Sequence, residues 1–531
     1  MRIMLPSRRQ FLAGGLASAA YARNALGQTP QRGGTLRSII NPEPPSLNLG
    51  FSQLEPMRTV GSKIYQGLLR YTFDLKPYPC VAKSWTISPD KLTYTFVLRD
   101  NATWHDGAPF TADDVVFSAG TFLPQTSARW RPVHEHIESI TALDPHTVQF
   151  RLRQPFSAFL SCFFNVNCVL MPRHIYDNGT DYRTNPANDR AIGTGPFKLQ
   201  EWRRGSFIHL VRHDGYWDSG KPYLDEIIYE VVPDSAQRVA AIETGRVDLV
   251  QNNDIEYFDV PRLRARKDLV FTTRGIEMES PVSWLDVNLR LPKFQDKRFR
   301  KAMMHALDRQ FIVDKLYFGL GKVANGPISE TTRYFDDSAL VKYPYDPKQA
   351  IALMDEMGLK PDANGIRQRV KLLALPYGEV WDRQAELVKQ QFGKVGIEVT
   401  IENTDTAGFL QRDSNWEYEL AFDFIGQFID PAIGVSRVYL SSNIRKGVFA
   451  TNVTGYVNPE VDDLFKRAAV ATSDTEAQQM YSRIQHIISD ELPVLYLTKL
   501  EWPTFHSPKL HDIIVDSDGP ANDFSGAWRS A

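Results

Sequence analysis

Runs of apolar residues divide the chain into short strands and helices. Residues 35–40 are apolar and β-branched, which predicts a buried strand, and the proline-rich residues 41–45 end it. Residues 60–69 place apolar side chains at helical spacing and predict a helix. Residues 82–87 and 93–98 predict a β-hairpin, because a Ser-Pro-Asp turn signal lies between two alternating runs. The pattern therefore indicates a mixed α/β chain.

The same reasoning places elements further along the chain. Thr111 is a good N-cap, and the acids Asp113 and Asp114 favour the first turn of a helix that follows it. Residues 283–288 predict a strand, and a helix is expected around residues 299–307. A further apolar run at 494–497 is followed by Pro503 and Pro508, which prevent a regular helix.

The first 27 residues have the pattern of an export signal. Arg8 and Arg9 stand before an apolar run of small residues, and Ala25 and Gly27 form a small-x-small cleavage site. The apolar run is shorter than the roughly 20 residues of a membrane span, so we expect the segment to be removed. No cysteine that could carry a lipid lies near the cut. These features predict twin-arginine export of a periplasmic protein that is not lipid-anchored and begins at Gln28.

The composition of the chain argues against several classes of protein. The formal charge is -2, and removal of the signal takes away arginines and no acid, which argues against a nucleic-acid partner. A chain of 531 residues predicts more than one domain. Three cysteines are too few for a disulfide framework, although Cys162 and Cys168 could pair or remain buried thiols.

Motifs for catalysis or metal binding are weak. Trp104-His105-Asp106-Gly107 joins an imidazole to a carboxylate, but neighbouring residues point in different directions, so a structural turn is favoured. His134 and His136 would share one face of a strand and could bind a metal, but no third ligand lies nearby in the sequence, so an exposed polar segment is favoured. No serine nucleophile elbow, His-Glu-x-x-His or Cys-x-x-Cys motif occurs. We expect no catalytic residue, no metal and no cofactor.

Ordered motifs are spread over essentially the whole chain after the signal. They lie at residues 80–85, 94–96, 98–99, 102, 104–107, 110–115, 193–197, 216–217, 220–225, 245–248, 296–302, 430–431, 455–456 and 458–462. These motifs resemble those of the oligopeptide/dipeptide-type extracellular solute-binding proteins (family 5) of ABC transporters.

The resemblance implies an α/β, two-lobed periplasmic binding protein (type II, large peptide-binding subclass) whose lobes close on a ligand about a hinge. It places lobe I at residues 28–280 with 500–531 returning to it, and lobe II at residues 281–499. It also implies a monomer that delivers its solute to ABC transporter permease subunits.

The resemblance also implies a binding site. One lobe contributes the segment after the first strand, at residues 53–55, and the other contributes the segment at residues 424–431. Arg412 falls near an arginine of the peptide binders and could hold a carboxylate or phosphate, although a solvated helix-end arginine is an equal alternative. The expected ligand-binding residues are Gln53, Leu54, Glu55, Arg412, Phe424, Ile425, Gly426, Gln427, Phe428 and Asp430.

One position departs from the family pattern. Peptide binders carry an aspartate three residues before the Asp/Glu-Pro pair, where it pairs with the α-amino group of the peptide, and this chain has Gln427 there. An amide lacks the charge that makes an ammonium contact strong, although Glu55 or Asp430 could supply one. The ligand is therefore expected to be a peptide or a peptide-sized polar solute, with an opine, a sugar conjugate or another non-peptide solute as the alternative. A remote alternative is an exported hydrolase.

Overall fold

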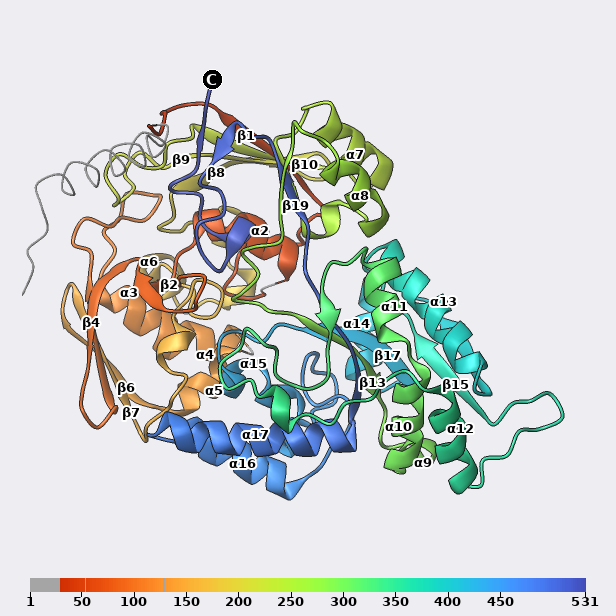
Figure 1. Cartoon of the computed structure of the whole chain (residues 1–531). Coiled ribbons are helices and arrows are strands. Elements are labelled where there is room, and N and C mark those ends of the chain that lie inside the picture. The colour runs from red at the N-terminus through yellow and green to blue at the C-terminus, as the bar shows by residue number, and fades with distance from the viewer. Residues whose placement is uncertain (1–28, 53, 128) are drawn as a thin grey trace, which may run out of the picture.

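The structure is a computed structural model that describes residues 29–52, 54–127 and 129–531. In this part of the chain two large sheets form separate halves of the molecule (Figure 1). The first sheet has the strand order β12 (Val270–Thr272), β19 (Thr504–His506), β11 (Leu249–Gln251), β1 (Thr35–Ile40), β10 (Glu226–Val231), β9 (Phe207–Arg212) and β8 (Phe197–Arg203). The second has the order β14 (Lys322–Val323), β18 (Val494–Lys499), β13 (Val282–Val287), β17 (Leu420–Ile425), β15 (Gln368–Leu373) and β16 (Ile397–Glu402).

Strands of the first sheet therefore come from residues 35–272 and from residues 504–506, whereas strands of the second come from residues 282–499. The chain passes between the sheets twice, at residues 273–281 and 500–503. These two crossover segments lie side by side, because the Leu500 N–H donates to the carbonyl oxygen of Pro281 at 2.9 Å.

A third, antiparallel sheet belongs to the N-terminal part. Its strand order is β4 (Ala82–Ile87), β5 (Thr93–Leu98), β7 (Thr147–Leu152) and β6 (Ile137–Asp144). Two small pairs complete the strands, β2 (Leu69–Tyr71) with β3 (Pro77–Pro79) and β20 (Leu510–His511) with β21 (Trp528–Arg529).

Helices surround these sheets. Those of the N-terminal part are α2 (Glu55–Ile64), α3 (Ala112–Phe117), α4 (Leu123–Thr126), α5 (Trp130–Glu135), α6 (Arg173–Tyr176), α7 (Ser235–Glu243) and α8 (Val260–Arg264). Those of the second half are α9 (Pro292–Gln295), α10 (Lys297–Ala306), α11 (Arg309–Phe311), α12 (Pro347–Glu356), α13 (Glu379–Gly393), α14 (Thr406–Ser414), α15 (Pro431–Gly434), α16 (Pro459–Val470) and α17 (Asp474–Glu491).

Two apolar cores correspond to the two halves. One is built around the second sheet, with Trp284, Phe299 and Tyr496 fully buried, and the other around the N-terminal elements, with Trp104, Phe96 and Tyr229. Helices α16 and α17 run along the base of the molecule in Figure 1, from beneath the third sheet towards the second sheet. There the Ser157 N–H donates to the Ala469 carbonyl oxygen at 2.8 Å, so the halves touch at this end.

Local signals in the sequence predict several elements correctly. The strand at 35–40 and the hairpin of β4 and β5 are confirmed. Thr111 precedes α3, and its N–H donates to Asp114 Oδ2 at 2.9 Å, as expected for a capping box. The helix expected around 299–307 is α10, and β13 and β18 contain the apolar runs at 283–288 and 494–497 almost entirely.

The helix predicted at residues 60–69 is wrong in its position. Helix α2 begins at Glu55, next to Pro56, and ends at Ile64. It stops there because the carbonyl oxygen of Ile64 accepts a hydrogen bond from the Gly195 N–H at 2.8 Å and the backbone becomes extended at Tyr65. Leu69 is buried as the first residue of β2.

Candidate functional site

A small cavity lies beside the crossover segments, where the two halves meet. Its lining comes from α2, from both crossover segments and from the C-terminal region, and it includes Glu55, Arg58, Asn252, Glu279, Trp502 and Asp518. Most of these side chains are polar or charged. The cavity is therefore polar, but it has room for little more than a water molecule and could not hold a peptide-sized solute without the lobes moving apart.

Two linked polar interactions form one wall of this cavity. Arg58 Nη1 donates to Glu279 Oε2 at 2.6 Å, and both side chains are largely buried. Glu55 Oε1 accepts hydrogen bonds from Asn252 Nδ2 at 2.6 Å and from Thr59 Oγ1 at 3.0 Å. Burial raises the pKa of the Glu55 carboxyl, whereas these two bonds and Arg58 oppose the shift.

A second contact joins the halves through aromatic and cationic groups. The guanidinium of Arg129, which precedes α5, lies 4.0 Å from the ring centroid of Phe428, which follows β17. The Phe428 ring stacks in turn on Phe164, with 6.0 Å between centroids and 16° between planes. Phe428 therefore belongs to the second half by sequence and to the N-terminal core by packing.

The backbone at this contact is strained. Phe428 has a φ of 47° and Ile429 a φ of 71°, although both are bulky residues that disfavour the left-handed region. Both side chains are almost fully buried in the N-terminal core. Burial of two large apolar side chains offsets such strain, and strained backbone of this kind is concentrated at ligand-binding positions.

Charged groups of the second half lie close to this contact. Arg437 donates to the carbonyl oxygens of Gly434 at 3.3 Å and Ala450 at 2.9 Å, and burial lowers its pKa to about 10. Asp423 accepts from the Phe424 N–H at 2.7 Å. Burial raises the pKa of Asp423 to about 7, so this acid is only partly ionised at neutral pH.

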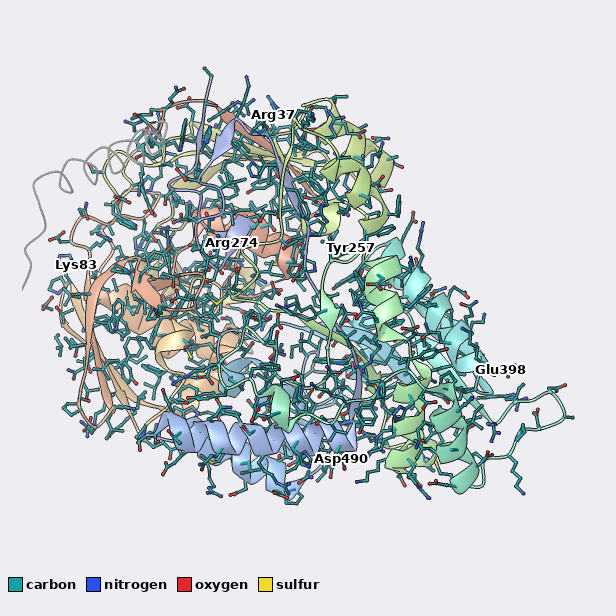
Figure 2. The ribbon with its side chains drawn as sticks, viewed as in Figure 1. Arg37, Lys83, Tyr257, Arg274, Glu398 and Asp490 are labelled. Atoms are coloured by element: carbon teal, nitrogen blue, oxygen red, sulfur yellow. The ribbon has the colours of Figure 1, made fainter. Side chains whose placement is uncertain are left out.

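An aromatic group surrounds the end of β17. The Phe424 ring stacks on Trp381 at 6.0 Å and makes edge contacts with Tyr377 at 6.2 Å and Trp502 at 6.1 Å. Trp502 belongs to the second crossover segment and also lines the cavity. Tyr257 and Tyr317 make a further contact between the halves, with 4.8 Å between ring centroids; Figure 2 labels Tyr257 at this junction.

The structure brings several of the predicted binding residues to this region. Glu55 lines the cavity, and Phe424 and Phe428 form the contacts described above. Ile425 is the last residue of β17 and is buried, and Gly426 packs closely because an added Cβ would lie 2.8 Å from the Phe428 ring. Leu54 is 37% exposed at the start of α2, and Gln53 lies outside the described residues.

Gln427 and Asp430 are wholly buried and bonded within the protein. Gln427 Nε2 donates to the Pro327 carbonyl oxygen at 3.0 Å, and its Oε1 accepts from the Ser329 N–H at 3.2 Å. Asp430 caps α15 by accepting from the Ala432 N–H at 2.9 Å, and its other oxygen lies 3.5 Å from Arg333 Nη1. Neither side chain belongs to the lining of the cavity beside the crossover segments.

The structure does not bring Arg412 to the junction. It lies in the last turn of α14, where it pairs with Glu402 and donates to the Glu417 carbonyl oxygen at 3.1 Å. Its charge is thus already compensated on lobe II. The position of Arg412 therefore fits an arginine at a helix end better than an arginine that contacts the ligand.

Sequence reasoning did not find Arg58, Arg129, Glu279 and Arg437. No motif contains them, and each acts at the junction only because the fold joins distant segments. The available signal was weak. Arg129 stands next to Trp130, and Arg437 comes directly before the apolar run at residues 438–440.

The other chemical candidates are structural. The His105 ring is hydrogen-bonded to the Gly195 carbonyl oxygen at 3.0 Å, and burial lowers its pKa to about 3. The strand that the metal alternative required for His134 and His136 does not form, because this segment is the end of helix α5. Both histidines are half-buried rather than exposed, and the His136 ring stacks on Phe156 at 4.2 Å. Cys162 and Cys168 are buried free thiols.

In residues 29–531 apart from 53 and 128, no helix is long and apolar enough to cross a membrane. In the same residues, no group of three or more His, Cys, Asp or Glu side chains is arranged to hold a metal ion.

Two α/β halves joined by two crossover segments, with polar and aromatic groups from both halves at the junction, define a two-lobed solute-binding protein. The sequence model of the bacterial extracellular solute-binding proteins, family 5 (middle region), matches residues 76–446. The chain belongs to this family.

Known relatives agree with this assignment. The chain is similar to the oligopeptide-binding protein AppA of Bacillus subtilis (strain 168), with 28% identity over 501 residues, which is 91% of this chain and 89% of the relative. The structure of AppA from Bacillus subtilis in complex with a nonapeptide has a TM-score of 0.82 and 25% identity, and the match covers 95% of this chain and 100% of AppA. The structure of AgaA from A. tumefaciens R10 in complex with agropinic acid has a TM-score of 0.80 and 24% identity. This match covers 94% of this chain and 99% of AgaA.

Proposed function

We propose that this chain is the solute-binding component of an ABC importer and captures a peptide or peptide-sized polar solute between its lobes. Lobe I comprises residues 28–280 with 500–531, and lobe II comprises residues 281–499. The observation that carries the proposal is the junction itself, where the Arg129 guanidinium of one lobe meets the Phe428 ring of the other at 4.0 Å. A solute bound beside this contact would touch both lobes.

Capture by this arrangement needs no chemical step. A ligand that touches both lobes stabilises the closed form by the difference between its affinities for the closed and open forms. Closure excludes water, which strengthens polar contacts with groups such as Glu55 and Asn252. The closed form then presents one surface to ABC transporter permease subunits, which are the expected partners.

The comparisons support a peptide as the first candidate and leave a second class of ligand in place. AppA, with 28% identity, is named an oligopeptide-binding protein and holds a nonapeptide in its structure. AgaA, which has the same fold, holds agropinic acid, and this favours an opine or another non-peptide solute as the alternative. Gln427 further supports the non-peptide alternative, because an amide lacks the charge with which the family's peptide binders hold the α-amino group of a peptide.

The proposed location is the periplasm, reached by the twin-arginine route. Family 5 proteins are extracellular by description, and Arg8, Arg9 and the site at residues 25–27 supply the export signal. The signal lies outside the described residues.

The experiment is native mass spectrometry of the protein taken from its own host, followed by thermal shift with the recovered solute. A solute that is retained, raises the melting temperature and is returned chemically unchanged fits a capture protein. Release of a cleaved product would favour the hydrolase alternative. Absence of any retained or stabilising solute from a panel of peptides, opines and sugar conjugates would contradict the proposal.

A further inference from the structure

A second and much larger cavity lies between the lobes. It has a volume of about 740 Å³, and among the described residues it shares no lining residue with the cavity beside the crossover segments. Lobe I contributes Glu256 and the start of α7, and lobe II contributes the start of α13 and the end of β16. In Figure 1, α7 lies above α13 on the right of the molecule. The volume is within the range of about 300–1,000 Å³ that is usual for ligand sites.

The position of this cavity relative to the two sheets is typical of a ligand site. Asn41 follows β1, and Pro233 comes shortly after β10, which is parallel to β1. Ala374 follows β15 and Asn403 follows β16, and these two strands are also parallel. All four residues line the cavity, so it lies at the carboxyl ends of parallel strands in both lobes. Open α/β sheets bind their ligands at this edge.

The lining of this cavity is strongly acidic. Its described residues include one guanidinium, that of Arg238, and five carboxylates. The carboxylates are those of Asp234 and Glu256 in lobe I and of Glu379, Asp382 and Glu386 in lobe II. The two lobes therefore present like charge to each other across the cavity, which opposes their approach unless a cation lies between them.

Glu256 is the most buried of these acids, with 8% of the residue exposed. Arg238 Nη2 lies 3.9 Å from Glu256 Oε1, too far for a hydrogen bond, and Arg238 donates instead to backbone carbonyl oxygens such as that of Asp254 at 2.7 Å. In the part of the chain that the structure describes, no side chain donates a hydrogen bond to the Glu256 carboxylate. A buried carboxylate in this position is costly, so we expect a donor to enter the cavity when the protein functions.

The Glu256 carboxylate points across the cavity towards lobe II. A Cβ added at Gly378, which precedes α13, would lie 3.3 Å from Glu256 Oε1. Burial raises the pKa of Glu256, and Arg238 and the Glu379 N–H oppose this shift only in part. A donor from the solute would therefore be shared between acids of the two lobes.

The acids of α13 form a stripe along one side of the helix. Asp382 and Glu386 follow Glu379 by three and seven positions, which is the spacing of one helical face. Glu379 pairs with Arg383 at 2.9 Å, whereas no Lys or Arg nitrogen of the described residues lies within 4.0 Å of Asp382. Acids in the first turn stabilise a helix, but Glu386 lies beyond that turn, four positions after Asp382, where two like charges weaken the helix. Helix stability alone does not explain the stripe.

The cation that suits this cavity is organic rather than a metal ion. A metal ion needs several ligands within about 2–3 Å, and among the described residues no group of three or more His, Cys, Asp or Glu side chains is arranged in that way. The carboxylates are instead spread around a volume of about 740 Å³. Ammonium and guanidinium groups on flexible chains have several N–H donors and can reach such separated acceptors.

An aromatic group connects this cavity with the segment that is predicted to bind the solute. Tyr377 lies in the sequence between two lining residues, Pro376 and Gly378, and its ring is 6.2 Å from that of Phe424. The Phe424 ring is 6.1 Å from that of Trp502, which lines the small cavity. The same aromatic group thus borders both cavities, and a solute beside Phe424 can extend into the acidic one.

We propose that the solute carries an ammonium or guanidinium group that binds in this acidic cavity, which Glu256 of lobe I and Asp382 of lobe II both line. This inference rests on the proposed function and names the class of solute that the site selects. A cation bound by both carboxylates replaces repulsion between the lobes by attraction to a shared partner, so binding favours the closed form. Gln427 is not among the described lining residues, so this preference is separate from any contact with the α-amino group of a peptide. The cation belongs either to a lysine or arginine side chain or to a polyamine.

The test uses Glu256→Gln and Asp382→Asn in the mature protein, with Asp113→Asn as a matched control. Asp113 is also an exposed acid in the first turn of a helix, α3, but it does not line the cavity. The probes are N-acetylated alanine pentapeptides with one lysine at each position in turn, the same peptides with norleucine in place of lysine, and spermidine. Norleucine keeps the apolar part of the side chain and removes its charge. Binding of these probes, and of any solute recovered from the host protein, is measured by calorimetry.

We expect lysine peptides or spermidine to bind, and lysine peptides to bind more tightly than their norleucine counterparts. Asp382→Asn should weaken binding of the cation about fivefold, the upper range for an exposed ion pair, and Glu256→Gln about 30-fold or more, as is usual when one partner of a buried pair is lost. The control should bind as the unaltered protein does. High salt should reduce the preference for lysine, because the acids of α13 are exposed. Binding of spermidine without binding of lysine peptides identifies a polyamine as the source of the cation.

Melting temperatures of the ligand-free variants separate binding from folding. Asp382→Asn should melt close to the unaltered protein, because the side chain is exposed. If Glu256→Gln lowers the melting temperature, Asp382→Asn decides the question. Weaker binding of the cation by Asp382→Asn supports the inference, and unchanged binding overturns it.

The failure of this inference can be distinguished from failure of the proposed function. Equal affinity for lysine and norleucine peptides, or a retained solute without a cationic group, overturns the inference and leaves solute capture intact. If no solute is retained and no probe binds, both are overturned.

Discussion

Arg58 of α2 and Glu279 of the first crossover segment form an ion pair at 2.6 Å that fastens lobe I to the segment leading into lobe II. Arg58 is 6% exposed and Glu279 13% exposed, so water does little to screen the pair. The backbone carbonyl oxygen of Glu279 also accepts the Gln427 N–H at 2.6 Å. Glu279 thus contacts both α2 and the segment that follows β17.

Replacement of Glu279 should be strongly destabilising. The Glu279→Gln variant keeps the shape of the side chain but leaves Arg58 buried without its partner, and loss of one member of a buried pair typically removes about 3–5 kcal/mol. Urea unfolding at pH 7 measures the change. Glu330→Gln is the control, because Glu330 forms more exposed pairs with Lys322 and Lys499 and should lose less than about 1 kcal/mol. Equal losses in the two variants would contradict the prediction.

A buried acid in lobe II should make stability depend on pH. Asp413 is fully buried, and both of its oxygens have no hydrogen-bond partner among the described residues. Burial raises its pKa well above the ordinary value, and Asp423 raises it further. The folded protein therefore holds a proton that the unfolded chain releases, so stability falls as pH rises from about 4 towards the raised pKa.

The Asp413→Asn variant removes this effect. We expect the variant to be no more stable than the unaltered protein at pH 4 and more stable at pH 8, because the slope contributed by Asp413 is about 1.4 kcal/mol per pH unit within that window. Thermal unfolding across pH 4–8 measures it. Asp463→Asn serves as the control, since Asp463 is exposed on α16. Parallel pH profiles for all three proteins would refute the assignment.

The sequence predicted elements whose causes are local. The strand at residues 35–40 is defined by its own apolar side chains, and the start of α3 by Thr111 and Asp114 three residues apart. The end of α2 was mispredicted because a distant partner, the Gly195 N–H, takes the carbonyl oxygen of Ile64. A periodic pattern contains no information about such a contact.

The same distinction applies to the site. The segment 424–430 could be found because family motifs surround it, and the structure places Phe424 and Phe428 at the junction. Arg129 and Arg437 are 308 positions apart in the sequence, and neither has a local motif. Their proximity is created by the fold, and only the structure shows that they share one environment.

Closure about the two crossover segments should be visible in solution. The lobes touch far from these segments, where Lys91 Nζ donates to the Thr472 carbonyl oxygen at 2.9 Å, so opening must break such contacts. We expect solution scattering to give a smaller radius of gyration with saturating solute than without it. Identical curves in the two states would argue against hinge motion.

Export should depend on both arginines of the signal. Replacing Arg8 and Arg9 by lysine keeps the positive charge but removes the motif, so we expect precursor to accumulate in the cytoplasm. Arg23→Lys is the control, since Arg23 lies outside the motif and should leave export unchanged. Cell fractionation and the mass of the mature protein, expected to begin at Gln28, measure the outcome. Normal periplasmic accumulation of the double variant would contradict the prediction.

The last prediction concerns the amino end of a peptide ligand. Gln427 is uncharged, and both polar atoms of its side-chain amide are already hydrogen-bonded. Its Nε2 donates to the Pro327 carbonyl oxygen, and its Oε1 accepts from the Ser329 N–H. The arginines at the junction would also repel an ammonium group. We therefore expect a free α-amino group to add nothing to binding, so a peptide and its N-acetylated form should stabilise the protein equally.

Thermal-shift measurements with di- to pentapeptides and their N-acetylated forms test this expectation. A solute that binds, present at a hundred times its dissociation constant, should raise the free energy of unfolding by about 2.7 kcal/mol. Gln427→Asp introduces the carboxylate that peptide binders carry, and it should recover a preference for the free amine. The shorter side chain cannot donate to the Pro327 carbonyl oxygen, so the variant itself should lose about 1–3 kcal/mol of stability. Binding must therefore be compared as the shift within each variant. If free peptides give the largest shifts in the unaltered protein and acetylation abolishes them, another acid such as Glu55 binds the ammonium group and the argument from Gln427 is wrong.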